Sequence, residues 1–189
     1  MPRPPVLPLL NWQEILTKGK AYSEWITTGE SPENREQMEA LRQKLTLAPH
    51  VEGFLKALPR KVHVAAFAED WCGDVVRHAP VLQKLADEAP NLDVRYLNRD
   101  DEPEAFARFL TNGGEAIPKF VFLSDNYVEC GNWGPMPAMC RELIARGKAC
   151  GDVSLGRKKV TGIYESDPNC RMTVEELIHL IDIASTIEP

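Results

Sequence analysis

The chain has 189 residues, 43% of them hydrophobic, and a formal net charge of −6. This length supports one substantial core rather than two independent ones. The net negative charge and the scattered positions of the Lys and Arg residues do not favour a nucleic-acid partner. No apolar run approaches the roughly 20 residues that span a bilayer, and the proline-rich start is unlike a signal peptide. A cytoplasmic protein without membrane contact is expected.

The cysteine count indicates reduced thiols. An odd number of cysteines does not make a disulfide scaffold, and a chain of this size does not need one. No Cys-x-x-Cys pair and no ligand-type His spacing occurs, so neither a metal nor a cofactor is predicted. The five cysteines are Cys72, Cys130, Cys140, Cys150 and Cys170.

The N-terminal third predicts helices. Apolar residues from Trp12 to Ile26 recur at near-helical spacing, and Ser31-Pro32 is a start signal for a second helix that reaches Leu45. Residues 1–48 therefore form a predicted helical extension. Its tryptophans either pack on the following domain or form a dimer contact.

The middle of the chain alternates strands and helices. A short helix around residues 51–58 precedes a buried strand at 62–68, a helix over 73–88, a strand at 93–97 and a helix through 106–110. This alternation favours an α/β sheet.

Residues 119–124 and 127–133 flank an Asp-Asn turn and predict an antiparallel hairpin. A helix over 138–149 follows. Residues 152–169 are compatible with a strand or a loop. The last helix is expected to open with a capping box formed by Thr173 and Glu176.

The order of these elements and the segment Phe67-Ala68-Glu69-Asp70-Trp71-Cys72-Gly73 resemble thioredoxins, whose pattern is Phe-x-Ala-x-Trp-Cys-Gly-Pro-Cys. Pro80 matches the proline that kinks this helix in the family, and Ile117-Pro118 matches its cis-proline. The resemblance spans about 51–133 and the final helix. It implies a thioredoxin-like fold over 49–189, a central mixed sheet flanked by helices, with an insertion at about 135–170.

Cys72 is the candidate catalytic residue. It lies where a strand ends and a helix begins, and the helix N-terminus stabilises a thiolate. The alternative is a small buried core cysteine, but the Trp-Cys-Gly context favours a reactive thiol. The expected active-site turn also contains Trp71, Gly73, Asp74 and Val75.

This turn departs from the family pattern. Val75 stands where the resolving cysteine would be, and Asp74 adds a carboxylate that competes with the thiolate for the helix dipole. Ala66 occupies the place of the family's buried aspartate. By topology, Cys130 is the nearest candidate for a resolving thiol.

The resemblance also implies a substrate groove. Ile117 would present its backbone to an extended segment beside Pro118, as in strand addition. Trp133 either lines this groove beside Trp71 or belongs to the core.

Two charged or titratable neighbours on the same helix are expected at the surface. Arg77 lies three residues after Asp74 and would form an exposed ion pair with it. His78, on the second turn, is expected to be a surface histidine rather than a proton donor.

The leading hypothesis is a monothiol redox protein in which Cys72 attacks a protein disulfide or a glutathione-type adduct and an external thiol completes the cycle. A second hypothesis is a binding module that keeps the groove but not the chemistry. A third is a peroxide sensor through a sulfenic acid at Cys72.

Overall fold

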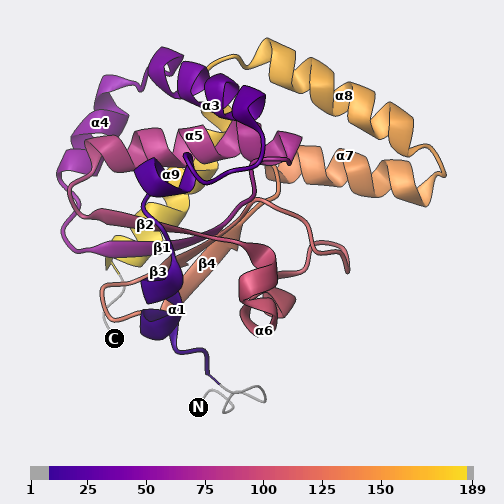
Figure 1. Cartoon of the computed structure of the whole chain (residues 1–189). Coiled ribbons are helices and arrows are strands. Elements are labelled where there is room, and N and C mark those ends of the chain that lie inside the picture. The colour runs from indigo at the N-terminus through magenta and orange to yellow at the C-terminus, as the bar shows by residue number, and fades with distance from the viewer. Residues whose placement is uncertain (1–8, 187–189) are drawn as a thin grey trace.

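A mixed sheet lies at the centre of the molecule (Figure 1). The computed structural model describes residues 9–186, and its sheet has the order β2-β1-β3-β4. β1 (Val62–Phe67) is parallel to β2 (Leu92–Leu97) and antiparallel to β3 (Lys119–Leu123), which pairs antiparallel with β4 (Glu129–Trp133). The predicted α/β fold with a central mixed sheet is confirmed.

The central strand explains why one core forms. Every residue of β1 is buried, as expected for a strand that has neighbours on both edges and helices on both faces. β4, at one edge, is mostly accessible until Trp133. The one large core therefore surrounds β1.

Helices cover both faces of the sheet. On one face, α5 (Gly73–Glu88) and α9 (Arg171–Thr186) pack against each other. On the other face lie α1 (Trp12–Lys18), α6 (Pro103–Phe106) and short helical turns at 99–101 and 107–109. Aromatic rings join these helices to each other and to the sheet, with Trp12 against Phe109 and Phe67 against Phe106. Within residues 9–186, no helix is both long and apolar enough to cross a membrane.

The N-terminal extension packs onto the sheet domain. It contains α2 (Tyr22–Trp25) and α3 (Pro32–Lys44), and α4 (Pro49–Lys56) leads into β1. Trp25 stacks on Tyr96 of β2 with ring centroids 4.6 Å apart. Residues 1–8 of the expected extension lie outside the described part of the chain.

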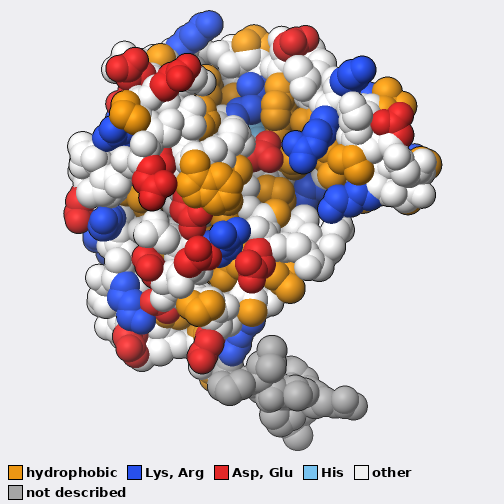
Figure 2. All heavy atoms as spheres, turned by 45° about the vertical axis from the view of Figure 1, so that its right-hand side comes forward, with side chains coloured by type: hydrophobic (Ala, Val, Ile, Leu, Met, Phe, Trp, Pro, Cys, Tyr) orange, Lys and Arg blue, Asp and Glu red, His pale blue; other side chains and the backbone are white. Residues whose placement is uncertain are grey.

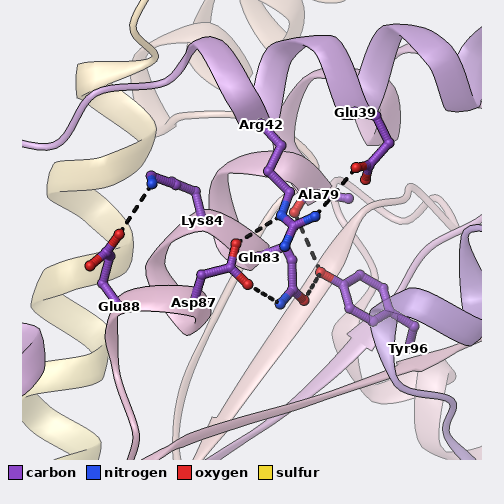
Figure 3. Close-up of polar contacts among 8 residues, drawn as sticks. All are labelled: Glu39, Arg42, Ala79, Gln83, Lys84, Asp87, Glu88 and Tyr96. Atoms are coloured by element: carbon purple, nitrogen blue, oxygen red, sulfur yellow. Dashed lines mark hydrogen bonds and ion pairs between the residues drawn. The ribbon is translucent and has the colours of Figure 1, made fainter.

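Polar contacts tie α3 to α5 (Figure 3). The Arg42 guanidinium donates to the Asp87 carboxylate at 2.8 Å and also pairs with Glu39. Beneath them, the Tyr96 hydroxyl lies 3.4 Å from the Ala79 carbonyl. The outer helix α3 is thus fixed to α5, the helix that begins directly after Cys72.

Asp70 connects the extension to the residues beside Cys72. Its buried carboxylate accepts hydrogen bonds from the backbone N–H groups of Glu30 and Ser31, at 3.0 and 2.7 Å. Its carbonyl accepts from the Asn34 amide at 2.8 Å. Residues 30–34, at the start of α3, are therefore held to Asp70, the residue before Trp71, by three hydrogen bonds.

The segment that the sequence left as strand or loop is helical. α7 (Ala138–Ala149) and α8 (Val153–Ser166) form an antiparallel helical hairpin that projects from the body in Figure 1. Gly156 permits their close packing, because a Cβ there would lie 2.9 Å from the Leu143 carbonyl oxygen. The expected insertion between β4 and the final helix is this hairpin.

The expected capping box at Thr173 and Glu176 is wrong. α9 begins at Arg171, and its first N–H groups donate to the Asp167 carboxylate at 2.9 and 3.2 Å. The Glu176 carboxylate instead accepts from the Trp133 indole at 2.6 Å and from the Ala138 N–H at 2.9 Å. Both side chains are used for tertiary contacts.

Replacing Asp70 by Ala is expected to destabilise the fold. The change leaves two backbone donors without a charged acceptor, which costs about 2–4 kcal/mol. Urea unfolding of D70A measures this loss. D100A, which removes an exposed carboxylate, is the control and is expected to change stability by less than about 0.5 kcal/mol. Equal stability of D70A and the unmodified chain would contradict this role of the Asp70 carboxylate.

Candidate functional site

Cys72 lies at the junction between β1 and α5. It is the N-cap residue of α5, in an extended conformation, and its side chain is half-buried. The thiol Sγ donates to the Ile117 carbonyl oxygen at 3.4 Å. The sulfur is therefore positioned between the first turn of α5 and the loop before β3.

Two opposing effects set the acidity of the Cys72 thiol. Burial raises its pKa above the ordinary value, and this is the largest effect. The backbone N–H groups of Val75 and Asp74 lower the pKa, while the carboxylates of Asp74 and Glu69 raise it again. The net direction is upward, so the thiol form dominates at neutral pH.

The residues that replace the family pattern have different environments. Val75, at the position of a resolving cysteine, is fully buried and packs in the core. Asp74 is half-buried, and burial raises its pKa despite a hydrogen bond from the Tyr164 hydroxyl. Ala66 lies in β1 between Tyr96 and Phe120, fully buried. No titratable group takes the place of the family's buried aspartate at this position.

Two prolyl loops meet beside Cys72. The Ile117–Pro118 and Gly134–Pro135 peptide bonds are both cis. Gly134 has a φ of 120°, and a Cβ at this position would lie 2.0 Å from the Pro118 carbonyl oxygen. Only glycine allows the two loops to approach this closely.

A buried lysine joins these loops. Lys119 directly follows Pro118, and its amine donates to the Thr111 hydroxyl at 2.8 Å and to the Gly134 carbonyl at 3.1 Å. Burial, helped by the charge of Arg141, lowers the pKa of Lys119 to about 8. Lys119 was not predicted as a site residue, although a lysine in an otherwise apolar strand is a detectable signal.

The two tryptophans near the site differ in exposure. Trp71 is 53% exposed beside Cys72, so its ring is available to a partner. Trp133 pairs with Phe120 across the hairpin, level with the loop as expected, but it is only 3% exposed. Its ring stacks on Phe120 and its indole N–H binds Glu176. Trp133 is a core residue beneath the site and presents little surface to a groove.

The expectations for Arg77 and His78 are wrong. Arg77 does not pair with Asp74: its guanidinium lies over the Tyr164 ring, 4.1 Å from the centroid, and donates to the Tyr164 and Asp167 carbonyls. His78 is fully buried. Its Nε2 lies 3.0 Å from the Tyr164 hydroxyl and its Nδ1 3.1 Å from the Thr173 hydroxyl. The α7–α8 hairpin covers the side of α5 that was expected to face solvent.

Cys130 is not placed to resolve Cys72. All five thiols are free. Cys130 was the nearest candidate, but it lies near the β4 end that pairs with Leu123, whereas the site adjoins the Phe120 end. At about 3.4 Å per residue this places it roughly 10 Å along the strand, beyond disulfide reach. Among the described residues, no group of three or more His, Cys, Asp or Glu side chains is arranged to hold a metal ion.

A mixed sheet with a cysteine at its first strand-to-helix junction, facing a cis-prolyl loop, defines a protein of the thioredoxin class. The family model described as Thioredoxin matches residues 19–153, and the chain belongs to this family. Membership supports a general function in thiol redox chemistry or another use of the thioredoxin fold. No curated protein sequence matches the chain.

Solved structures show the same fold. A protein of unknown function from Pseudomonas aeruginosa is similar at 15% identity and a TM-score of 0.71, with 92% of this chain and 98% of that chain covered. An HIV epitope-scaffold is similar at 16% identity and a TM-score of 0.73, with the same coverage of both chains.

Replacing Asp74 by Asn is expected to make Cys72 more acidic. Removing a nearby negative charge lowers the thiol pKa by about 0.5–1 unit. Because nucleophilicity falls with pKa, alkylation at pH 7.5 accelerates only about two- to threefold. The pH profile of iodoacetamide alkylation, resolved by peptide mass spectrometry, measures both effects. D101N, at an exposed position, is the control. An unshifted profile in D74N would exclude Asp74 as a determinant of thiol acidity.

His78 is expected to make the fold acid-sensitive. Burial, with a smaller effect of Arg77, lowers its pKa to about 3, against about 6.5 in an unfolded chain. Below pH 6.5 the unfolded state binds a proton that the folded state does not, so stability falls as the pH falls. The loss from pH 7 to pH 5 is about 2 kcal/mol. Urea unfolding at pH 7 and pH 5 measures this loss of stability. The loss is expected to be about 2 kcal/mol smaller in H78Q than in the control H50Q, whose histidine is exposed.

Proposed function

We propose that this chain carries out thiol–disulfide exchange through Cys72 as a monothiol. The observation that carries the proposal is the position of Cys72: it is the N-cap residue of α5, its sulfur lies 3.4 Å from the Ile117 carbonyl, and Val75 occupies the position of a resolving cysteine. The helix N-terminus favours a nucleophilic thiolate, and the missing resolving cysteine requires an external thiol to finish the cycle.

The exchange balances as follows. The Cys72 thiolate attacks one sulfur of a substrate disulfide, a new S–S bond forms, the old one breaks, and the other substrate sulfur leaves as a thiolate. An external thiolate of the glutathione type then attacks the Cys72 sulfur of the mixed disulfide, and the partner sulfur leaves as a thiolate. A second external thiolate attacks the external sulfur now bonded to Cys72 and releases the Cys72 thiolate. Two external thiols are thereby oxidised to one disulfide, and the substrate disulfide is reduced to two thiols.

The substrate class follows from the surroundings of the sulfur. The exposed Trp71 ring offers an apolar contact on one side. On the other side, Ile117 and Pro118 present backbone beside the sulfur, which suits an extended segment of a protein partner. A protein disulfide or a mixed disulfide between a protein and a glutathione-type thiol fits this arrangement.

The raised pKa of Cys72 determines the conditions of the chemistry. Because the thiol dominates at neutral pH, exchange accelerates with increasing pH until the thiolate predominates. A slow thiol without a resolving partner produces a long-lived mixed disulfide. The proposed protein is therefore suited to capturing a partner rather than to rapid turnover.

A second candidate function is a binding module with a vestigial thiol. One observation favours it: the Cys72 thiol is half-buried, hydrogen-bonded to Ile117 and raised in pKa, all of which stabilise the unreacted form. In this case the surface around Trp71 binds a partner without covalent chemistry.

Glutathione disulfide at pH 8.5 is expected to modify Cys72 reversibly. The test uses a C130S/C150S variant, which removes the more accessible other thiols and retains the buried Cys140 and Cys170. Peptide mass spectrometry should locate the adduct on Cys72, and reduced glutathione should remove it. The same variant with C72S is the matched control and should acquire no adduct.

Two outcomes separate the candidates. A reversible adduct on Cys72 of the folded protein supports monothiol exchange. If the adduct forms only after unfolding in urea, monothiol exchange is wrong and the binding module stands.

A further inference from the structure

A chain of hydrogen bonds runs from the core of the molecule to the active-site turn. The Thr173 hydroxyl of α9 lies 3.1 Å from Nδ1 of His78, and Nε2 of His78 lies 3.0 Å from the Tyr164 hydroxyl. The Tyr164 hydroxyl donates to the Asp74 carboxylate at 3.4 Å. Asp74 is two residues from Cys72, so α8 reaches the thiol through a single carboxylate.

The direction of each hydrogen bond follows from donor and acceptor chemistry. An ionised Asp74 only accepts, so Tyr164 donates its single proton to it. The Tyr164 oxygen then accepts from His78 Nε2–H, and Nδ1 accepts from the Thr173 hydroxyl. Neutral His78 fits these bonds, because burial lowers its pKa to about 3. All three hydrogen bonds can therefore form at the same time, each donated in the direction of Asp74.

Tyr164 itself is firmly held. Its ring lies under the Arg77 guanidinium and edge-on to His78, with centroids 5.5 Å apart. Arg77 also donates to the Tyr164 and Asp167 carbonyls, at 3.2 and 2.7 Å. The end of α8 is thus attached to α5 at the second turn after Cys72.

We propose that Tyr164 is a positioning residue for Cys72: its hydroxyl holds the Asp74 carboxylate in place beside the thiol, and the docked α7–α8 hairpin thereby restrains thiol reactivity. The proposal extends the proposed function by naming how the same site is regulated, and its importance for exchange rests on that function. Displacing the hairpin would release the restraint.

The charges around Asp74 support this arrangement. α7 and α8 together carry six Lys and Arg residues against two Glu residues, and Figure 2 shows basic side chains gathered on the hairpin. Arg157 of α8 favours the ionised form of Asp74. Two other charged or titratable groups face Asp74 or Cys72. The Asp74 carboxylate raises the pKa of Cys140 in α7, and Glu69, before the turn, raises the pKa of Cys72.

The direction of the effect follows from solvation. Burial is the main penalty on the Asp74 carboxylate, and the Tyr164 hydroxyl is its direct hydrogen-bond donor within the hairpin. Without that donor, the carboxylate turns toward water, where its charge is screened from the thiol. The pKa of Cys72 then falls and the thiolate becomes more abundant.

The test is a double-mutant cycle between Tyr164 and Asp74, in the C130S/C150S background. Y164F removes only the hydroxyl and is expected to lower the apparent pKa of Cys72 alkylation by about 0.5 unit, which raises the rate at pH 7.5 about twofold. In a D74N background, Y164F is expected to change neither value. Y127F, which removes a hydroxyl at the β3–β4 turn, is the matched control.

Each possible outcome of the cycle either supports or overturns the proposal. A shift in Y164F that disappears in D74N supports the proposal. A faster rate without a pKa shift, a shift that persists in D74N, or an unchanged profile in folded Y164F overturns it, and urea unfolding verifies folding. Alkylation needs no disulfide chemistry. A missing glutathione adduct therefore overturns the proposed function alone, while failure of the cycle overturns the action of Tyr164 alone.

Discussion

The contact between the Cys72 thiol and the Ile117 carbonyl is the point on which the rest of the site depends. It joins the first turn of α5 to the loop before β3, two segments 45 residues apart in the chain. The sheet makes this contact possible, because antiparallel pairing of β1 with β3 brings the end of one strand to the start of the other. The Cys72 sulfur is thereby placed at the edge of a rigid core rather than on a free loop.

The sequence was sufficient for the elements with strong local signals. β1 is a continuous apolar run, and α5 has a periodic apolar face, so both were predicted close to their observed bounds. The antiparallel hairpin and its register near Trp133 also followed from the strands and the turn between them. The position of Cys72 followed from the order of these elements. Local periodicity and connectivity determine these features, and both can be read from one sequence.

Features that depend on tertiary contacts were not predicted. His78 and Arg77 lie on the face of α5 that would be solvated if no hairpin covered it. No residue near them in sequence indicates that Tyr164, 86 residues after His78, packs there. The same applies to Glu176, which fits a capping box locally but is used by Trp133. A polar residue at a helix start has several possible partners, and local rules do not include those that arrive from another part of the chain.

The attachment of Asp70 to the loop at residues 30–31 has a consequence for where the protein can be divided. By sequence, the boundary between extension and sheet domain lies near residue 48, yet the hydrogen bonds of Asp70, two residues before Cys72, cross it. The extension is therefore a supporting layer of the site and not an appended module. Exchange of this extension between relatives, or its loss, would alter the scaffold that aims Trp71 and Cys72 while leaving every residue of the turn unchanged.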